Sequence, residues 1–150
     1  MLGIGLLLSA CTQAPKTAAF ANKAALKAHN PSSNVERLET WRDAKRLADT
    51  SDEQVVLVGQ GESMAPLFGD NTILVINEID FDKLEPGMDV AYLNKQGRRV
   101  VHRLKAQDAI GNWIVQGINN DAEDESRVTR SNLMGVVYAS FVHEDALEEL

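Results

Sequence analysis

The sequence predicts a mainly β domain, a twisted and mostly antiparallel sheet or partial barrel, preceded by a helical N-terminal tether. Beyond Asp52, short runs rich in Val, Ile and aromatic residues are bounded by Gly, Asn, Asp or Pro, which is typical of strands. Turn-forming tetrapeptides and hexapeptides such as FGDN, LEPGMD, NKQG and AIGN separate these runs, and such short reversals favour antiparallel neighbours. The six predicted strands are QVVLVG, NTILVINEI, DVAYLN, RRVVHRLKAQ, NWIVQG and MGVVYASFV.

A helix is expected just before the strands, over residues 34–49. Ser33 precedes Glu36 by three positions, as in a capping box at a helix N-terminus. The apolar stripe that would cover the sheet consists of Val35, Leu38, Trp41, Ala44 and Leu47.

Composition divides the chain into three parts. Residues 1–11 read as a lipoprotein-type signal segment, and residues 12–50 as a tether, rich in Ala, Lys, Thr, Ser and Pro at its start, that ends in the amphipathic helix. Residues 51–150 form the β domain, which is large enough for one hydrophobic core.

Charge and cysteine content exclude several classes of function. The 150-residue chain has a net charge of −7, which argues against a surface that follows nucleic-acid phosphates. Its single cysteine rules out an intrachain disulfide and a Cys-rich zinc site. The acidic run at 121–125 lacks the glycine and the distant glutamate of a calcium loop, so we expect neither a metal nor another cofactor.

The cysteine itself ends an apolar stretch, MLGIGLLLSAC. Leu8-Ser9-Ala10-Cys11 resembles the lipobox of bacterial lipoproteins, in which Cys11 would become the N-terminal, lipid-bearing residue after cleavage. The apolar run is shorter than the ~20 residues that span a bilayer and suits a signal peptide, although no basic segment precedes it. The alternatives are a start site further upstream or an ordinary N-terminus with a free or buried cysteine.

Two segments carry the residues of a hydrolytic site. In GESMAP, at the end of a strand, Ser63 lies in a turn-like segment that would expose its hydroxyl. A serine is a weak nucleophile unless a base lies within hydrogen-bonding reach, and His102 in the strand RRVVHRLK is the candidate base. Taken alone, a strand histidine is more often a structural residue, so the order of the motifs has to support the pairing.

That order resembles the type I signal peptidases of the Ser-His branch, which include the catalytic subunit of the endoplasmic-reticulum enzyme and its archaeal and spore-former relatives. GESMAPLFGD, LEPGMDVAYLN, VVHRL, QGINNDAEDES and LMGVV follow one another in the family's order across residues 55–139. The resemblance implies the sheet or partial barrel of the signal peptidase and LexA-like folds.

The resemblance also implies roles for individual residues. Ser63 would be the nucleophile and His102, at the position of the lysine of ordinary bacterial enzymes, the general base. Gly61, Met64 and Pro66 would shape the substrate groove: Gly61 would let a peptide approach the serine, Met64 would pack beside the groove and Pro66 would stiffen the turn. From the block after the histidine, Gly117, Asn119, Asn120 and Asp124 match the family pattern, with Asp124 the residue that would orient the imidazole.

Two departures from the family pattern bear on activity. Ile118 replaces the first aspartate of the Gly-Asp-Asn-Asn block, and Gly61 stands where many signal peptidases have a serine that helps to bind the oxyanion. Asp121 could replace Asp124 if the loop shifts, and Asp124 could equally be a solvated loop acid. Lysine catalysis, through Lys95 or Lys105, stays open as an alternative to His102.

The sequence therefore predicts a serine endopeptidase, tethered to a membrane by lipid on Cys11 in the bacterial cell envelope and facing the periplasm or exterior. Its partners would be peptide or protein substrates, with small residues one and three positions before the cleaved bond, and the membrane, but no nucleic acid. Two rivals remain: an impaired lipoprotein that holds extended peptides by strand addition, and a self-cleaving regulator of the LexA type.

Overall fold

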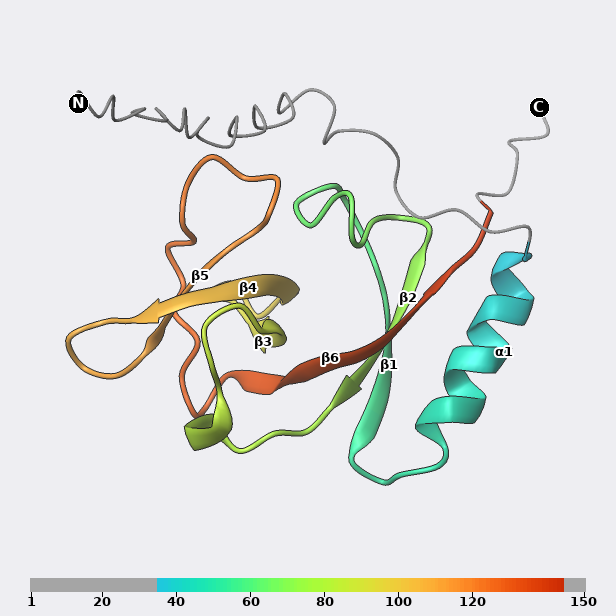
Figure 1. The fold of residues 1–150 in the computed structure, drawn as a ribbon, viewed down its shortest axis with the longest axis horizontal. Coiled ribbons are helices and arrows are strands. Elements are labelled where there is room, and N and C mark those ends of the chain that lie inside the picture. Colours follow the sequence, from blue (N-terminus) through green and yellow to red (C-terminus); the bar gives the residue numbers. More distant parts are fainter. Residues whose placement is uncertain (1–34, 145–150) are drawn as a thin grey trace, which may run out of the picture.

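The computed structural model describes residues 35–144, so Cys11, Ser33 and the predicted signal and tether segments lie outside the described residues. One helix and six strands make up this part of the chain (Figure 1). Their bounds are α1 (Arg37–Ala48), β1 (Gln54–Val58), β2 (Thr72–Asn77), β3 (Asp89–Leu93), β4 (Arg99–Gln107), β5 (Trp113–Gln116) and β6 (Leu133–Val142), with a 3-10 turn η1 (Phe81–Lys83) before β3.

All six predicted strands are present and form a single antiparallel sheet in the order β1-β2-β6-β3-β4-β5. The mainly β fold is thereby confirmed. The sheet is open, because β1 and β5 are its two ends and do not pair with each other. The long strand β6 joins the two halves, since its N-terminal part pairs with β3 and its C-terminal part with β2 (Figure 1).

The prediction for the helix is correct in place, wrong in its start and only partly right in its buried face. Helix α1 begins at Arg37, and its N-cap Glu36 makes no side-chain capping hydrogen bond. The face against the sheet is centred on Thr40, Ala44 and Ala48, at i, i+4 and i+8, so it includes Ala44 of the expected stripe, with Leu47 partly buried beside it. Leu38 and Trp41 of that stripe are partly to largely exposed.

Helix α1 belongs to the same core as the strands. Ala44 and Ala48 pack with Ile73 and Val75 of β2, and Leu74 and Ile76 of the same strand pack into a second cluster on the opposite face. Because side chains alternate along a strand, β2 is buried on both sides. The helix is thus a structural layer of the domain, and the expected boundary at residue 50 does not mark a break in packing.

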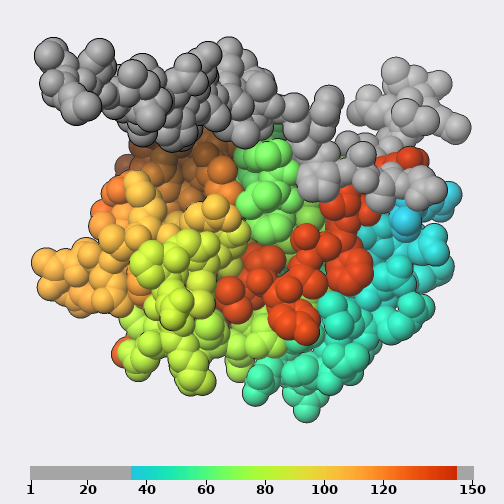
Figure 2. Space-filling view, viewed as in Figure 1, coloured from blue at the N-terminus to red at the C-terminus, as the bar shows by residue number. Residues whose placement is uncertain are grey.

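A third cluster lies under β3, β4 and β5 and positions the candidate site. It contains Leu84, Val90, Tyr92, Leu104, Trp113, Val115 and Val128, all buried. In Figure 2 the side chains of β6 form a band across one face, between α1 and the green segment that leads into β3. The two halves of the sheet therefore meet along β6.

Candidate active site

The nucleophile candidate lies in a tight turn just after β1. The N–H of Ala65 donates to the carbonyl of Glu62 and that of Leu67 to the carbonyl of Met64, so the chain reverses immediately around Ser63. The Ala65-Pro66 peptide within this turn is cis. The N–H of Gly61, at φ +76°, donates to Asp70 Oδ1 at 2.6 Å, which ties the start of the turn to its end.

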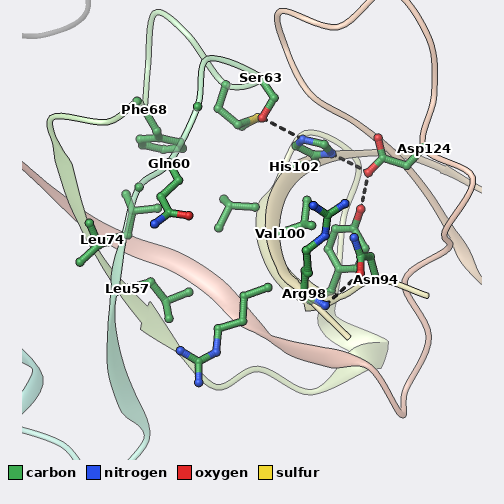
Figure 3. A pocket seen from close by; sticks show the side chains of 18 of the residues that line it. Leu57, Gln60, Ser63, Phe68, Leu74, Asn94, Arg98, Val100, His102 and Asp124 are labelled. Carbon is green, nitrogen blue, oxygen red and sulfur yellow. Dashed lines mark hydrogen bonds and ion pairs between the residues drawn. The ribbon is translucent and has the colours of Figure 1, made fainter. Parts of the chain in front are cut away.

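Three side chains from separate segments form one continuous hydrogen-bonded line (Figure 3). The Oγ of Ser63 lies 3.0 Å from Nε2 of His102, and Nδ1 of His102 lies 2.5 Å from Oδ2 of Asp124. The side chains of His102 and Asp124 are only 8% and 15% exposed. An ionised carboxylate only accepts hydrogen bonds, so Nδ1 carries the proton and Nε2 is free to accept the serine proton.

The loop over residues 117–126 holds both ends of this line. The N–H of Asn119 donates to the carbonyl of Ser63 at 2.8 Å, and its side-chain amide donates to the carbonyl of Glu62 at 3.1 Å. Further along, the N–H of Asp124 donates to Val115 and the Arg127 guanidinium donates to the Asp124 carbonyl. The Asp124 carboxylate and the backbone around Ser63 are therefore held by the same segment.

Gly117 is required by close approach. A Cβ at this position would lie 2.7 Å from the Ser63 carbonyl oxygen and 2.8 Å from the Asn120 side-chain nitrogen, inside normal contact distance. Gly117 and Asn119, two of the residues on which the sequence resemblance depends, thus both approach the backbone carbonyl of Ser63. Ile118 between them is 37% exposed, and the carboxylate that contacts His102 comes from Asp124.

A pocket of about 970 Å³ opens in front of the serine. Figure 3 shows apolar side chains opposite the Ser63–His102 pair, among them Leu57, Phe68, Leu74 and Val100. Gly61 and Met64 also line the pocket, whereas Pro66 is not among its lining residues and its part is confined to the turn. Nothing lies within 4 Å of a Cβ built on Gly61, so its flank of the pocket is open.

Two open strand edges border this pocket. The N–H of Gly59 donates to Thr72 and that of Glu78 to Glu53, so odd-numbered residues of β1 face β2. By the alternation of an antiparallel ladder, the backbone groups of Val56 and Val58 face away from β2, towards the pocket they line. The first part of β4 also has an unpaired edge, because its pairing with β5 begins only at Arg103. Arg99 and Val101 in this first part line the pocket.

The lysine alternatives are not placed for catalysis. Nζ of Lys105 lies 2.9 Å from Glu123 in an exposed ion pair, and Lys95 is an exposed turn residue. Neither lines the pocket that contains Ser63. Asp121 is exposed, and the contact to His102 is made by Asp124.

The other histidine among the described residues is buried. Its place beside the acidic run EDALEEL predicts an exposed side chain, but His143 is 2% exposed, and its Nδ1 lies 2.8 Å from the carbonyl of Glu144. His29 lies outside the described residues. His102 is thus the one histidine of residues 35–144 that contacts a serine.

Sequence reasoning missed Tyr92 and Arg127. The buried phenol of Tyr92 donates to the same Oδ2 of Asp124 that contacts His102. Burial raises the pKa of Tyr92, and its hydrogen bond to Asp124 and the negative charge there raise the pKa further. Only the register of β3 against β4 indicates that Tyr92 lies near His102: Tyr92 is opposite Val100, which is two residues before His102 and therefore on the same face.

A scan against protein-family models gives no match for the chain, and a search of curated proteins gives none either. No helix among residues 35–144 has the length and apolar character needed to cross a membrane. The same residues contain no group of three or more His, Cys, Asp and Glu side chains placed to hold a metal ion. The geometry around Ser63 is therefore the basis on which a function can be assigned.

Proposed function

We propose that the protein is a serine endopeptidase in which Ser63 is the nucleophile, His102 the general base and Asp124 the residue that orients the imidazole. The observation that carries this proposal is the unbroken line from Ser63 Oγ through both ring nitrogens of His102 to Asp124, at 3.0 and 2.5 Å. The line lies at the wall of a large, partly apolar pocket. A nucleophile, a base and a base-orienting acid in hydrogen-bonding contact are the parts that peptide-bond hydrolysis by serine requires.

The chemical steps follow from this order of groups. Ser63 Oγ attacks the peptide carbonyl carbon while Nε2 of His102 takes its proton, and Asp124 stabilises the resulting imidazolium. The imidazolium then protonates the leaving amine as the C–N bond breaks, which leaves an acyl group on Ser63. A water molecule deprotonated by His102 hydrolyses this ester and restores the serine.

The negative oxygen of the tetrahedral intermediate needs hydrogen-bond donors. Within the described turn, the N–H of Ser63 donates to no other group and is the first candidate. The N–H of Gly61 is engaged by Asp70, and Gly61 has no hydroxyl to offer. Since one missing oxyanion donor raises a barrier by roughly 3 kcal/mol, the proposed enzyme would be slow unless the bound substrate brings a further donor close.

The open strand edges support an extended peptide as the substrate. A peptide lying along β1 would bond to the free backbone groups of Val56 and Val58, which have no partner strand on that side. Alternate side chains of such a peptide would point into the apolar part of the pocket. We propose that exported proteins with small residues before the cleaved bond are the substrates, and that the fold is of the signal peptidase and LexA-like type.

We also propose that lipid on Cys11 attaches the enzyme to the membrane of the bacterial cell envelope, on the periplasmic or exterior side. Several acyl chains on one residue would be needed for firm attachment. The test is the Cys11→Ser variant, in which fatty-acid labelling and membrane retention are both expected to be lost. Retention of the label in that variant would rule out Cys11 as the lipid site.

The test of the catalytic proposal is cleavage of a peptide library with alanine one and three positions before the bond, followed by mass spectrometry. Ser63→Ala and His102→Ala are each expected to abolish cleavage, whereas the control Ser131→Ala, at an exposed serine, keeps it. Cleavage that persists in either of the first two variants would refute the assignment.

The second candidate function is peptide binding without cleavage. The open edges of β1 and β4 and the absence of a side-chain hydroxyl at Gly61 favour it. It predicts that wild-type protein and Ser63→Ala bind the same extended peptides equally and that neither cleaves them.

A further inference from the structure

Tyr92 is a buried phenol that the proposed mechanism does not use. It is fully buried, and its ring packs in the cluster under β3, β4 and β5. Its hydroxyl nevertheless leaves this apolar surrounding to reach Asp124. A buried hydroxyl needs a partner, but a carboxylate partner in contact with a histidine suggests more than satisfaction of a hydrogen bond.

Strand register explains how the phenol reaches this place. In the β3–β4 pair, Val90 lies opposite His102 and Tyr92 lies opposite Val100. Side chains two residues apart on a strand share a face, so Tyr92 and His102 are diagonal neighbours on that face. Both therefore approach the Asp124 carboxylate from adjacent strands, while the carboxylate comes from the loop beyond β5.

The two contacts meet on one oxygen atom. Tyr92 Oη and His102 Nδ1 both bond to Oδ2 of Asp124. With the backbone of Asp124 held by Val115 and Arg127, these two donors determine where the carboxylate oxygen lies and which way it faces.

We infer that Tyr92 is a positioning residue of the proposed peptidase, which holds Oδ2 of Asp124 against Nδ1 of His102 and so keeps Nε2 as the proton acceptor for Ser63. This inference depends on the proposed function. Burial and the neighbouring carboxylate both raise the pKa of Tyr92, so the phenol stays protonated and donates throughout the range in which an imidazole titrates. The carboxylate thus has one donor that does not change with the protonation of His102.

The charged and titratable groups around this contact come from several segments. They are His102 on β4, Arg98 just before that strand, and Asp124, Glu125 and Arg127 in the loop after β5. Of these, only His102 and Asp124 bond through their side chains along the line to Ser63.

The informative variant is Tyr92→Phe, which keeps the ring and removes only the donor. A hydrogen bond to a charged group is worth enough that we expect kcat to fall roughly tenfold, with KM changed less than about twofold. Losing the donor destabilises the carboxylate and leaves more of its charge to act on His102. Both effects move the acid limb of the pH–rate profile to higher pH.

Two comparisons separate positioning from simple packing. Tyr138→Phe removes a phenol hydroxyl at a side chain that is 60% exposed, and it is expected to leave kcat and the pH profile unchanged. In an Asp124→Asn background, Tyr92→Phe is expected to cost almost nothing further, because Tyr92 acts through Asp124. If Tyr92→Phe lowered kcat in the Asp124→Asn background by the same factor as in wild type, the inference would be overturned.

A second readout keeps this test separate from the test of peptidase activity. The ring of His102 can be followed by nitrogen NMR, and in Tyr92→Phe its titration midpoint is expected to move to higher pH relative to wild type. An unmoved midpoint overturns the role of Tyr92 even if the protein cleaves peptides. A moved midpoint in a protein that cleaves nothing supports the Tyr92–Asp124–His102 coupling and counts against the peptidase proposal alone.

Discussion

Replacement of Gly117 by alanine tests whether the loop after β5 sets the position of the nucleophile. The new Cβ would lie 2.7 Å from the Ser63 carbonyl oxygen, and since such contacts normally exceed 3.0 Å, one backbone must move by several tenths of an ångström. The bond from the Asn119 N–H to that same carbonyl, at 2.8 Å, would be strained or lost. Because Ser63 Oγ is 3.0 Å from His102, such a displacement brings the pair out of good hydrogen-bonding geometry.

The magnitude follows from the sensitivity of catalysis to position. A misplacement of about 1 Å can cost about 100-fold, so a shift of several tenths of an ångström is expected to lower kcat by roughly 4-fold to 25-fold. Overpacking between two backbone segments is expected to lower the free energy of unfolding by about 1–3 kcal/mol. The assay is peptide cleavage per folded molecule, with the folded fraction taken from urea unfolding curves.

The matched control is Gly111→Ala. Gly111 has φ +84° and open space around its Cβ position, so alanine there costs about 1–2 kcal/mol of backbone strain without touching Ser63. We expect Gly111→Ala to lose stability and keep kcat. If Gly117→Ala also kept wild-type kcat per folded molecule, the idea that this loop positions the serine would be refuted.

Three further predictions concern the site and its borders. Asp124→Asn is expected to lower kcat by ~10⁴, because an amide that donates to Nδ1 of His102 favours the wrong tautomer; a loss below tenfold in peptide assays would contradict this. The pKa of Tyr92 is raised in the folded state, whereas a tyrosine in the unfolded state has a pKa of about 10, so the folded state keeps the phenolic proton to higher pH. The stability that this proton contributes is complete below pH ~10 and is lost as pH rises above it. Urea unfolding curves should show this alkaline loss of stability in wild type and a weaker loss in Tyr92→Phe. Val58→Pro removes a backbone N–H that faces the pocket, so it is expected to raise KM with a modest loss of stability. Leu57→Pro removes an N–H that faces β2, so it is expected to break the ladder to β2 and unfold the protein in the same urea assay. Equal destabilisation by the two variants would contradict the assigned strand edges.

The sequence predicted every strand because each is a compact apolar run between turn residues, and such runs depend on local chemistry. It placed Ala44 correctly on the buried face of α1 but chose Leu38 and Trp41 in place of Thr40 and Ala48, because large apolar residues fit an apolar stripe better than small ones. Small residues were selected there by close packing on β2, which only the tertiary structure defines. Whether the strands form an open sheet or a partial barrel, the two forms that the sequence left open, likewise depends on long-range pairing that a local pattern does not contain.

For the candidate site, motif order brought Ser63, His102 and Asp124 together as a hypothesis, but it left open which acid faces the imidazole. Backbone pairing determines which acid faces the imidazole. The N–H of Asp124 donates to the carbonyl of Val115 in β5, and β5 pairs with β4, the strand that carries His102. Asp121 lies three residues earlier, on the exposed part of the loop, so sequence proximity alone could not exclude it.

The loop after β5 also explains why the departure at Ile118 need not remove the proposed chemistry. Its first residues contact the nucleophile turn through backbone and amide groups of Gly117 and Asn119, while its last residues carry the carboxylate. An acid at position 118 would project from a side chain that is 37% exposed, between these two functions. The loop thus contacts Ser63 and His102 through groups that a change at position 118 leaves in place. The carboxylate that bonds to the imidazole is that of Asp124, to which Tyr92 also donates.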